Sequence, residues 1–386
     1  MNLCEEFRLL VMSKVLVMES TYDTCHEAVE QAFSHFPIDM AGKKVAIKTN
    51  ALKASDPDLQ AMATHYKLVR AVVKKVETFR PSSIVVGDSV GTESYGNSEY
   101  VFQISRQKEA AGSYYRNLNR RMIAVEMEEP FKRKIALLRD VMEADIYISV
   151  PKMKTHGLTM ISGAMKNNYG LLAGAQKSWF HYYSGDPKRF ARVVVELFRM
   201  RPPDLVIMDG ILAMEGYGPA SPETRWVNKI LAATDAVALD TVEAKIVGFT
   251  VGDVPYLTIA RELGLGETDL NAIEVLGEIT TIEEYHRPVP PESSYRYKAG
   301  VGSGWTNREF FRTRVAYRPV FSSEKCDQEC KACVDACPSG ALTTGPDSPV
   351  LDSEKCMLCT ACKESCDQEA IRLEPDEKIL SLLNDS

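Results

Sequence analysis

The sequence predicts an α/β fold, with a mostly parallel sheet covered by helices on both faces, followed by a small α+β domain at the C-terminal end. Two observations predict this. Short apolar strands alternate with helices between residues 14 and 250, the pattern of a parallel sheet buried on both sides. Eight of the ten cysteines fall between residues 326 and 366. With 386 residues, 45% of them hydrophobic, the chain can bury a large core.

The elements of the α/β part follow in order from their apolar spacing. The helix predicted over 66–79 places Leu68, Val69, Val72, Val73 and Val76 on one face. Other helices are predicted at 22–36, 189–199 and 236–247. Strands are predicted at 15–18, 43–47, 83–86, 146–150, 205–208 and 229–233.

The predicted elements divide the chain into five parts. We expect an N-terminal extension at 1–13, the α/β domain at 14–280, a linker or wrapping segment at 281–320, the cysteine-rich domain at 321–375 and a tail at 376–386. The apolar runs are too short for a membrane helix of about eighteen residues, so we expect no membrane span and a cytoplasmic protein. The oligomeric state is not in the sequence.

The cysteines form two runs with related spacing. They read Cys326-x3-Cys330-x2-Cys333-x3-Cys337-Pro338 and Cys356-x2-Cys359-x2-Cys362-x3-Cys366. Four disulfides would suit a secreted protein, but we expect no signal peptide, and the rest of the chain has only Cys4 and Cys25. Zinc sites use paired C-x2-C knuckles without the further cysteines seen here. The spacing favours iron–sulfur clusters.

This segment resembles the bacterial two-cluster ferredoxins. The resemblance implies a two-cluster ferredoxin-like domain with two [4Fe–4S] clusters, in which the fourth cysteine of each run ligates the other cluster. One cluster would then be held by Cys326, Cys330, Cys333 and Cys366, and the second by Cys356, Cys359, Cys362 and Cys337. An extra residue lies between Cys326 and Cys330, and Asp367 takes the place of a proline. The insertion alters a loop but removes no ligand.

Polar residues follow five of the predicted strands. They are Lys48-Thr49-Asn50, Asp88-Ser89, the segment from Pro151 to His156, Asp209-Gly210 and Thr234-Asp235. Ligands of open parallel sheets bind outside the carboxyl ends of the strands, so we expect a site at this edge. Each signal is weak alone, because loops are polar and Asp235 is well placed as a helix N-cap.

Residues 151–170, PKMKTHGLTMISGAMKNNYG, carry the strongest site pattern. Lys152, Lys154, His156, Lys166 and Asn167 fall within about fifteen residues, a set suited to binding a carboxylate or phosphate and to proton transfer. A loop with solvated lysines is the alternative. The adjoining GLLAGAQKS at 170–178 is not a P-loop, because it lacks the required spacing and follows no predicted strand.

Six segments resemble, in order, the bacterial and archaeal family called domain of unknown function 362, whose members often carry a C-terminal ferredoxin module. They are VAIKTN at 45–50, THYKLVRAVV at 64–73, VVGDSVG at 85–91, the stretch at 144–172, IMDGILAMEGYGP at 207–219 and ATDAVALDTV at 233–242. The resemblance implies an iron–sulfur protein of anaerobic or redox metabolism with no assigned substrate. Thr49 and Tyr66 replace prolines usual in the family.

The resemblance marks a set of polar residues by position: Lys48, Asn50, His65, Asp88, Lys152, Lys154, His156, Lys166, Asn167, Asp209, Glu215 and Asp240. From these we expect His156, Lys166 and Lys152 to be catalytic. The expected substrate-binding residues are Lys48, Asn50, Asp88, Lys154, Asn167, Asp209 and Glu215. A fainter likeness, on His156 and the segment SGAMK at 162–166, is to nickel-pincer lactate racemase.

Three functional hypotheses follow. The first is an iron–sulfur oxidoreductase that passes electrons to a small anionic substrate or cofactor in the α/β domain, although no dinucleotide or flavin motif is present. The second is an electron carrier or maturation protein that docks to another redox enzyme. The third is a ligand-binding or isomerase-type module whose clusters are structural or sensing.

Charge bears on the partner. From Phe321 onward, fourteen acidic residues face six basic ones, whereas the rest of the chain is balanced. This surface would steer a basic redox partner or would simply be solvated. We expect a redox partner protein or a small anionic ligand, and no nucleic acid.

Overall fold

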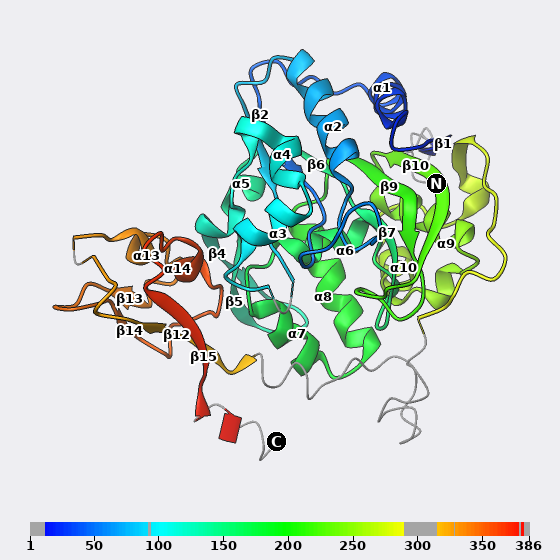
Figure 1. Ribbon diagram of the computed structural model, residues 1–386. Helices are drawn as coiled ribbons and strands as arrows, with labels where there is room; N and C mark the ends of the chain where they lie inside the picture. The colour runs from blue at the N-terminus through cyan, green and yellow to red at the C-terminus, as the bar shows by residue number, and fades with distance from the viewer. Residues whose placement is uncertain (1–11, 92–93, 289–314, 328, 378–379, 382–386) are drawn as a thin grey trace, which may run out of the picture.

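The computed structural model describes residues 12–91, 94–288, 315–327, 329–377 and 380–381. Most of the expected extension and of the expected linker lies outside these residues. Figure 1 shows a large α/β body with the cysteine-rich module packed against one side of it. No helix in the described part of the chain is long and apolar enough to cross a membrane.

The body is built on a nine-stranded mixed sheet in which most neighbouring strands are parallel, as predicted. Its order is β11 (Ile273–Gly277), β1 (Ser13–Glu19), β10 (Thr224–Ala233), β9 (Leu205–Met214), β6 (Ile146–Ser149), β2 (Lys44–Lys48) and β3 (Ser83–Gly87). Beside this path, β7 (Lys152–His156) pairs with β9 and with β8 (Met160–Ile161). Strand β10 is antiparallel to both neighbours.

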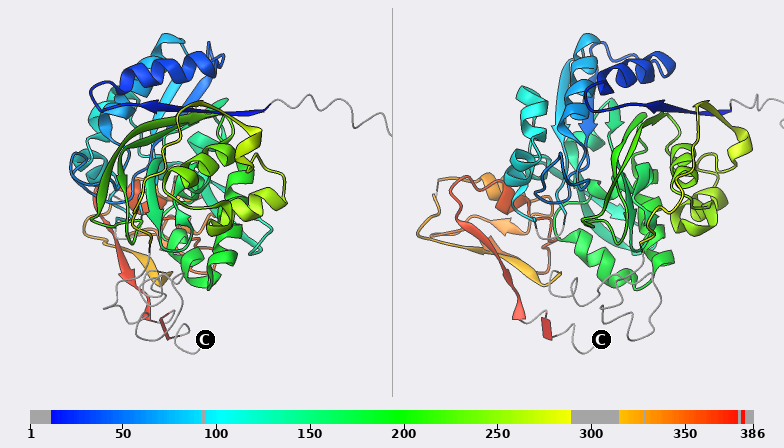
Figure 2. Two further views of the ribbon diagram at one scale, coloured as in Figure 1. Left: turned by 90° about the vertical axis from the view of Figure 1, so that its right-hand side faces the viewer. Right: turned by 45° about the vertical axis from the view of Figure 1, so that its right-hand side comes forward.

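Helices cover both faces of the sheet, as Figure 2 shows. One core contains α1 (Cys25–His35), α2 (Tyr66–Thr78) and α4 (Gln107–Ala111), and the other contains α8 (Pro187–Met200), α9 (Ala236–Ile246) and α10 (Pro255–Glu262). In β1, Val15 and Val17 enter one core, whereas Leu16 and Met18 enter the other. This alternation is why the strands read as continuous apolar runs.

The remaining elements lie around this frame. They are α3 (Ser98–Ile104), α5 (Arg139–Met142), α6 (Gly163–Asn167), α7 (Gln176–Ser184), the hairpin of β4 (Met122–Met127) and β5 (Arg133–Leu138), and short 3-10 turns such as η2 (Leu118–Arg120) and η3 (Asn168–Leu171). Two helix starts follow from capping. The Asp186 side chain accepts from the Arg189 amide at 2.9 Å ahead of Pro187, and Asp235 accepts from the Val237 and Ala238 amides. The N-cap prediction for Asp235 is therefore confirmed.

Three expectations about the strand ends were wrong. Strand β9 does not end before Asp209 but continues to Met214, so Asp209 and Gly210 lie within the strand. Because β10 runs antiparallel to β9, its carboxyl end and Asp235 lie at the opposite edge from the ends of β6 and β9. The segment after β6 is not a loop. The strand is interrupted at Pro151, and Lys152–His156 then forms the buried strand β7, which pairs with β9.

Among the described residues, the C-terminal module contains two small sheets and two short helices. Strand β12 (Tyr317–Phe321) pairs with β15 (Ile371–Pro375), β13 (Leu342–Thr343) pairs with β14 (Val350–Leu351), and the helices are α13 (Ala332–Asp335) and α14 (Ala361–Glu364). Glu364 is buried and links the module to the body. Its carboxylate accepts hydrogen bonds from Ser98 Oγ at 2.6 Å and from Asn117 Nδ2 at 2.9 Å. Charge-assisted bonds out of water are the strong kind, so the module is firmly docked.

Candidate functional site

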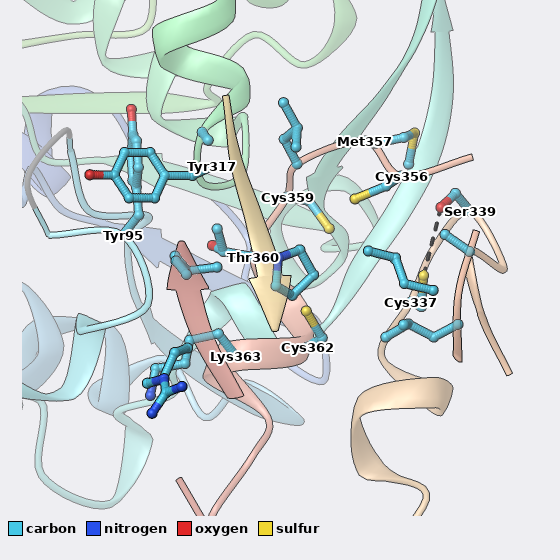
Figure 3. Close-up of a pocket in the computed structure, with 18 of the residues that line it drawn as sticks. Tyr95, Tyr317, Cys337, Ser339, Cys356, Met357, Cys359, Thr360, Cys362 and Lys363 are labelled. Atoms are coloured by element: carbon cyan, nitrogen blue, oxygen red, sulfur yellow. Dashed lines mark hydrogen bonds between the residues drawn. The ribbon is translucent and has the colours of Figure 1, made fainter. Parts of the chain in front are cut away.

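The eight cysteines of the module line two separate cavities. Cys337, Cys356, Cys359 and Cys362 line a cavity of about 520 Å³, here called the inner cysteine cavity. Their sulfur atoms face a common space in Figure 3. Cys326, Cys330, Cys333 and Cys366 line a cavity of about 120 Å³, the outer cysteine cavity. All eight are free thiols.

Backbone conformation gathers the inner set. Leu358 and Thr360 both adopt φ of +57°, which curls the chain tightly on either side of Cys359. A left-handed conformation at a non-glycine residue is strained, and it persists only where contacts with the surrounding structure stabilise it. Cys337 reaches the set from the other run, as the crosswise arrangement requires.

The thiols are a suitable donor set for a cluster. Burial raises the pKa of Cys359 to about 12, so this sulfur would ionise only against a compensating positive charge, which bound metal supplies. Among the described residues, no three His, Cys, Asp or Glu side chains gather around a point as a single ion needs. In an iron–sulfur cube each thiolate takes a different iron, so the sulfurs need not converge. The two sets could therefore bind metal clusters.

A second candidate site lies in the body. This cavity of about 230 Å³, here called the α/β pocket, is lined by residues that follow β2 and β3 and by residues of β7, α6 and α7. Six predicted site residues line it: Asn50, Asp88, Lys154, His156, Lys166 and Asn167. Lys48 lies next to this lining. It is fully buried and forms an ion pair with Asp88 at 2.6 Å.

Besides Lys48, three predicted residues lie outside the pocket lining. Lys152 is buried and pairs with Asp209 at 2.9 Å. The Tyr22 hydroxyl and the His65 amide complete this network by donating to Asp209. Glu215 pairs instead with Arg225 at 2.7 Å. These contacts give Lys152 and Asp209 the surroundings of a structural ion pair.

The list of expected site residues left out several polar residues of the lining, among them Tyr169, Lys177 and His181. Lys177 and His181 stand four residues apart on α7, a spacing that puts them on one helix face. That spacing is the signal in the sequence that indicates both residues.

The pocket lysines differ in how their amines are held. Lys177 Nζ donates to Ser89 O, Ser89 Oγ and Val90 O at 2.6–2.9 Å. Lys154 Nζ donates to Asn50 Oδ1 at 2.7 Å and to Met62 O at 3.1 Å. Lys166 Nζ lies over the rings of Tyr169 and Phe190, 5.3 and 5.9 Å from their centroids. No hydrogen-bond acceptor for it occurs in the part of the chain that the structure describes.

Burial and mutual repulsion make these amines weakly basic. Burial, then Lys166, lowers the pKa of Lys154 to about 7, and burial, then Lys48, does the same to the pKa of Lys166. Burial is also the main cause that lowers the pKa of Lys177 to about 7. An anion would return all three to the charged form, so the pocket is suited to a small anion.

The two pocket histidines are neutral, in different tautomers. Burial lowers the pKa of His156 well below its ordinary value, and burial lowers that of His181 to about 3. His156 Nδ1 accepts from the Leu158 amide at 3.1 Å, so its Nε2 carries the proton. His181 Nδ1 lies 2.7 Å from Lys177 O, a carbonyl that only accepts, so this nitrogen carries the proton. His156 therefore offers an N–H at Nε2.

Asp240 positions the helix that carries Lys166. Its carboxylate accepts from the amides of Ala164 at 2.5 Å and Met165 at 3.0 Å, in the first turn of α6. A Cβ on Gly163 would lie 2.6 Å from Asp240 Oδ2, and this glycine has φ of +62°. Only glycine fits here.

A thin wall separates the α/β pocket from the inner cysteine cavity. Ala175 lines the inner cavity, and Lys177, two residues further on, lines the pocket. The Ala175 amide donates to Leu358 O at 2.9 Å. A Cβ on Gly174 would lie 2.6 Å from Cys359 O, so the two backbones touch.

Comparison with curated proteins gives a partial match. Over 135 residues it is 36% identical to a thylakoid-associated protein from Synechocystis sp., a match that covers 35% of this chain and 42% of that protein. The chain thus matches less than half the length of this curated relative.

Two solved structures are remotely similar. The lactate racemase apoprotein from Thermoanaerobacterium thermosaccharolyticum gives a TM-score of 0.38 at 12% identity, over 58% of this chain and 54% of that one. A structural-genomics protein from Thermotoga maritima gives 0.33 at 11% identity, over 53% and 54%. The family is defined by sequence: residues 45–245, more than half of the chain, match the model described as Domain of unknown function (DUF362), and the chain belongs to that family.

Proposed function

We propose that this chain is an iron–sulfur redox protein, an oxidoreductase that exchanges electrons between a partner protein and a small anion held in the α/β pocket. Its C-terminal ferredoxin-like domain holds two [4Fe–4S] clusters, which supply one-electron transfer. The division of the cysteines supports this proposal, because each cavity collects three cysteines of one run and the fourth of the other.

The observation that carries the proposal is the wall at residues 174–177. The loop around Cys359 contacts Gly174 and Ala175 on one side, and Lys177 faces the pocket on the other. A redox module docked elsewhere on the body would not need this contact. The shared wall supports electron transfer between the inner cysteine set and the α/β pocket.

Pocket residues take distinct roles in the proposal. Lys154 and Lys177 supply positive charge while their own acceptors fix their positions. His156 offers a neutral N–H donor, and Asp240 positions the α6 turn that carries Lys166. Lys152 and Asp209 form a buried ion pair between β7 and β9, outside the pocket lining, and stabilise the fold rather than bind the ligand.

The outer cysteine set is the proposed entry point for the redox partner. Cys330 is exposed, whereas Cys359 and Cys362 are buried. Acidic residues dominate the sequence of this module, which favours a basic partner that approaches the exposed set.

Iron analysis of anaerobically purified full-length protein tests the clusters. We expect about eight irons per chain. Cys337→Ser and Cys366→Ser should each disturb a different cluster and lower the iron content by up to half, while Cys25→Ser, in helix α1, should leave it unchanged. Iron content near four in the unaltered protein would contradict two-cluster binding.

Mass spectrometry of small molecules released from the same protein tests the pocket. An organic anion that is lost in the Lys154→Met variant, with iron unchanged, is the expected result. If the protein has full clusters but its pocket neither retains nor binds an anion, the oxidoreductase function is contradicted and the electron-carrier function is favoured.

A further inference from the structure

We propose that Lys166 is a nucleophile that forms an imine with a small 2-oxo acid, an anion whose carbonyl is adjacent to its carboxylate. The inference rests on the proposed function of the α/β pocket as an anion site, and it names the class of anion and the atom that reacts with it.

The amine of Lys166 is available in a way that the other pocket amines are not. Lys177 Nζ is saturated by three acceptors, and Lys48 Nζ is held by Asp88, Thr49 O and Asn167 Oδ1. Lys154 Nζ has two acceptors. Among the described residues, Lys166 Nζ has no hydrogen-bond or ion-pair partner and lies over the faces of two aromatic rings, so its nitrogen lone pair can turn to a ligand without breaking a hydrogen bond.

The surroundings also favour the neutral, reactive form of this amine. Lys166 shares the pocket with Lys154 and lies close to Lys48, and each cation disfavours a further positive charge. Its lowered pKa, about 7, leaves about half of the amine unprotonated at neutral pH. A desolvated lysine beside another cation is a recognised way to activate an amine toward carbonyl groups.

The rest of the lining suits the carboxylate of such a substrate. Lys154 keeps one N–H beyond its two acceptors, and this N–H can donate to the carboxylate. The pocket, about 230 Å³, is below the usual range for drug-sized ligands, about 300–1,000 Å³. A substrate of a few heavy atoms is therefore the best match.

The reaction balances without an oxidant or reductant. The neutral amine attacks the carbonyl carbon, the nitrogen loses its protons to the departing oxygen, and one water leaves as the carbon–nitrogen double bond forms. The Nε2–H of His156 can donate to the carbonyl oxygen, and Asp240 holds α6 so that Lys166 stays in the lining. Asp240 is thus a positioning residue and Lys166 the catalytic one.

Reductive trapping tests the proposal. Full-length, anaerobically purified protein is incubated with pyruvate or glyoxylate and cyanoborohydride, then denatured and analysed by intact mass and peptide mapping. We expect one reduced adduct per chain, on the peptide that contains Lys166, with labelling more than about tenfold above that of exposed lysines. Lys166→Arg should lose the adduct, while Lys74→Arg, a matched change on an exposed helix face, should keep it.

Adducts spread over surface lysines, an undiminished adduct in Lys166→Arg, or no adduct would each overturn the proposal. Peptide mapping of the unaltered protein identifies the labelled lysine even where a variant fails to fold. Iron content in the same sample separates the two proposals. Full clusters without an adduct reject the nucleophile alone, whereas an adduct without clusters rejects the redox function alone.

Discussion

The Ala175 amide donates a 2.9 Å hydrogen bond to the carbonyl of Leu358. This bond joins two residues far apart in sequence: Ala175 stands two residues before the pocket lysine Lys177, and Leu358 precedes the inner cysteine Cys359. It is supported on the same face by buried Glu364, which accepts from Ser98 and Asn117. The docked position of the C-terminal module is therefore encoded in specific polar contacts, and these can be tested one at a time.

Gly174→Ala should displace the module. Gly174 has φ of +52°, and a Cβ there would lie 2.6 Å from Cys359 O. Gly185→Ala is the matched control, since Gly185 has φ of +74° with open space around its Cβ position. Both changes should cost about 1 kcal/mol or more of backbone strain, but only Gly174→Ala should increase protease cleavage within 315–377 and speed iron loss. Equal behaviour of the two variants would show that the contact is not needed.

Glu364→Leu should weaken the same docking. The change leaves Ser98 Oγ and Asn117 Nδ2 buried without their acceptor, at a cost of about 1–3 kcal/mol for each unsatisfied group. Asp367→Asn is the control, because Asp367 pairs with Arg120 across the same interface but is largely exposed, and such pairs contribute less than about 1 kcal/mol. Hydrogen exchange of α3 and η2 measures the effect. Equal protection in both variants would contradict the role of Glu364.

Lys152→Met should destabilise the fold and leave anion binding intact. The change leaves the Asp209 carboxylate buried without its partner. Removing one partner of a buried ion pair lowers stability by about 3–5 kcal/mol. Lys14→Met, which breaks the exposed pair with Glu274, should cost less than about 1 kcal/mol. Urea unfolding compares the two variants. If the Lys152→Met protein has normal stability but no longer binds anions, Lys152 belongs to the anion-binding site.

Anion affinity should fall as the pH rises. The pKa values of Lys154, Lys166 and Lys177 are each lowered to about 7, so the pocket is cationic below pH 7 and loses charge above it. Inorganic phosphate, which cannot form an imine, is the probe. Calorimetry should show tighter binding at about pH 6 than at about pH 8, although phosphate itself gains charge over that range. Equal or tighter binding at the higher pH would reject the lysines as the source of affinity.

Stability without ligand should have the opposite pH dependence. In the folded protein these amines release their protons near pH 7, whereas in the unfolded chain they keep them up to about pH 10.4. Between these values the unfolded state binds more protons, so the free energy of unfolding rises with pH. Denaturant unfolding of Lys154→Met, which removes one of the three groups, should show a smaller rise than the unaltered protein. An equal rise in that variant would show that Lys154 does not contribute.

Much of the frame was predictable from local sequence. Apolar segments appear where expected in β1, β2, β3, β6 and β9, as does the 3.6-residue spacing of α2 and α8. Burial of one or both faces of an element requires apolar residues at regular positions, and this pattern is visible in the sequence. The β4–β5 hairpin and α7 were missed, since their packing depends on contacts with distant segments. The antiparallel direction of β10 was also missed, because strand direction depends on how the chain returns to the sheet.

The sequence by itself determined the α/β class, the two cysteine runs and the cation-rich segment around His156, because these depend on residue type and spacing alone. Only the tertiary structure decided which of these groups meet. Lys152 and Lys154 are two residues apart on β7 and would share a face of a regular strand, but the pairing register with β9 shifts between them. One amine therefore pairs with Asp209 and the other enters the pocket, where α7 brings Lys177 and His181 to meet it. Such partnerships depend on long-range packing, which no local spacing records.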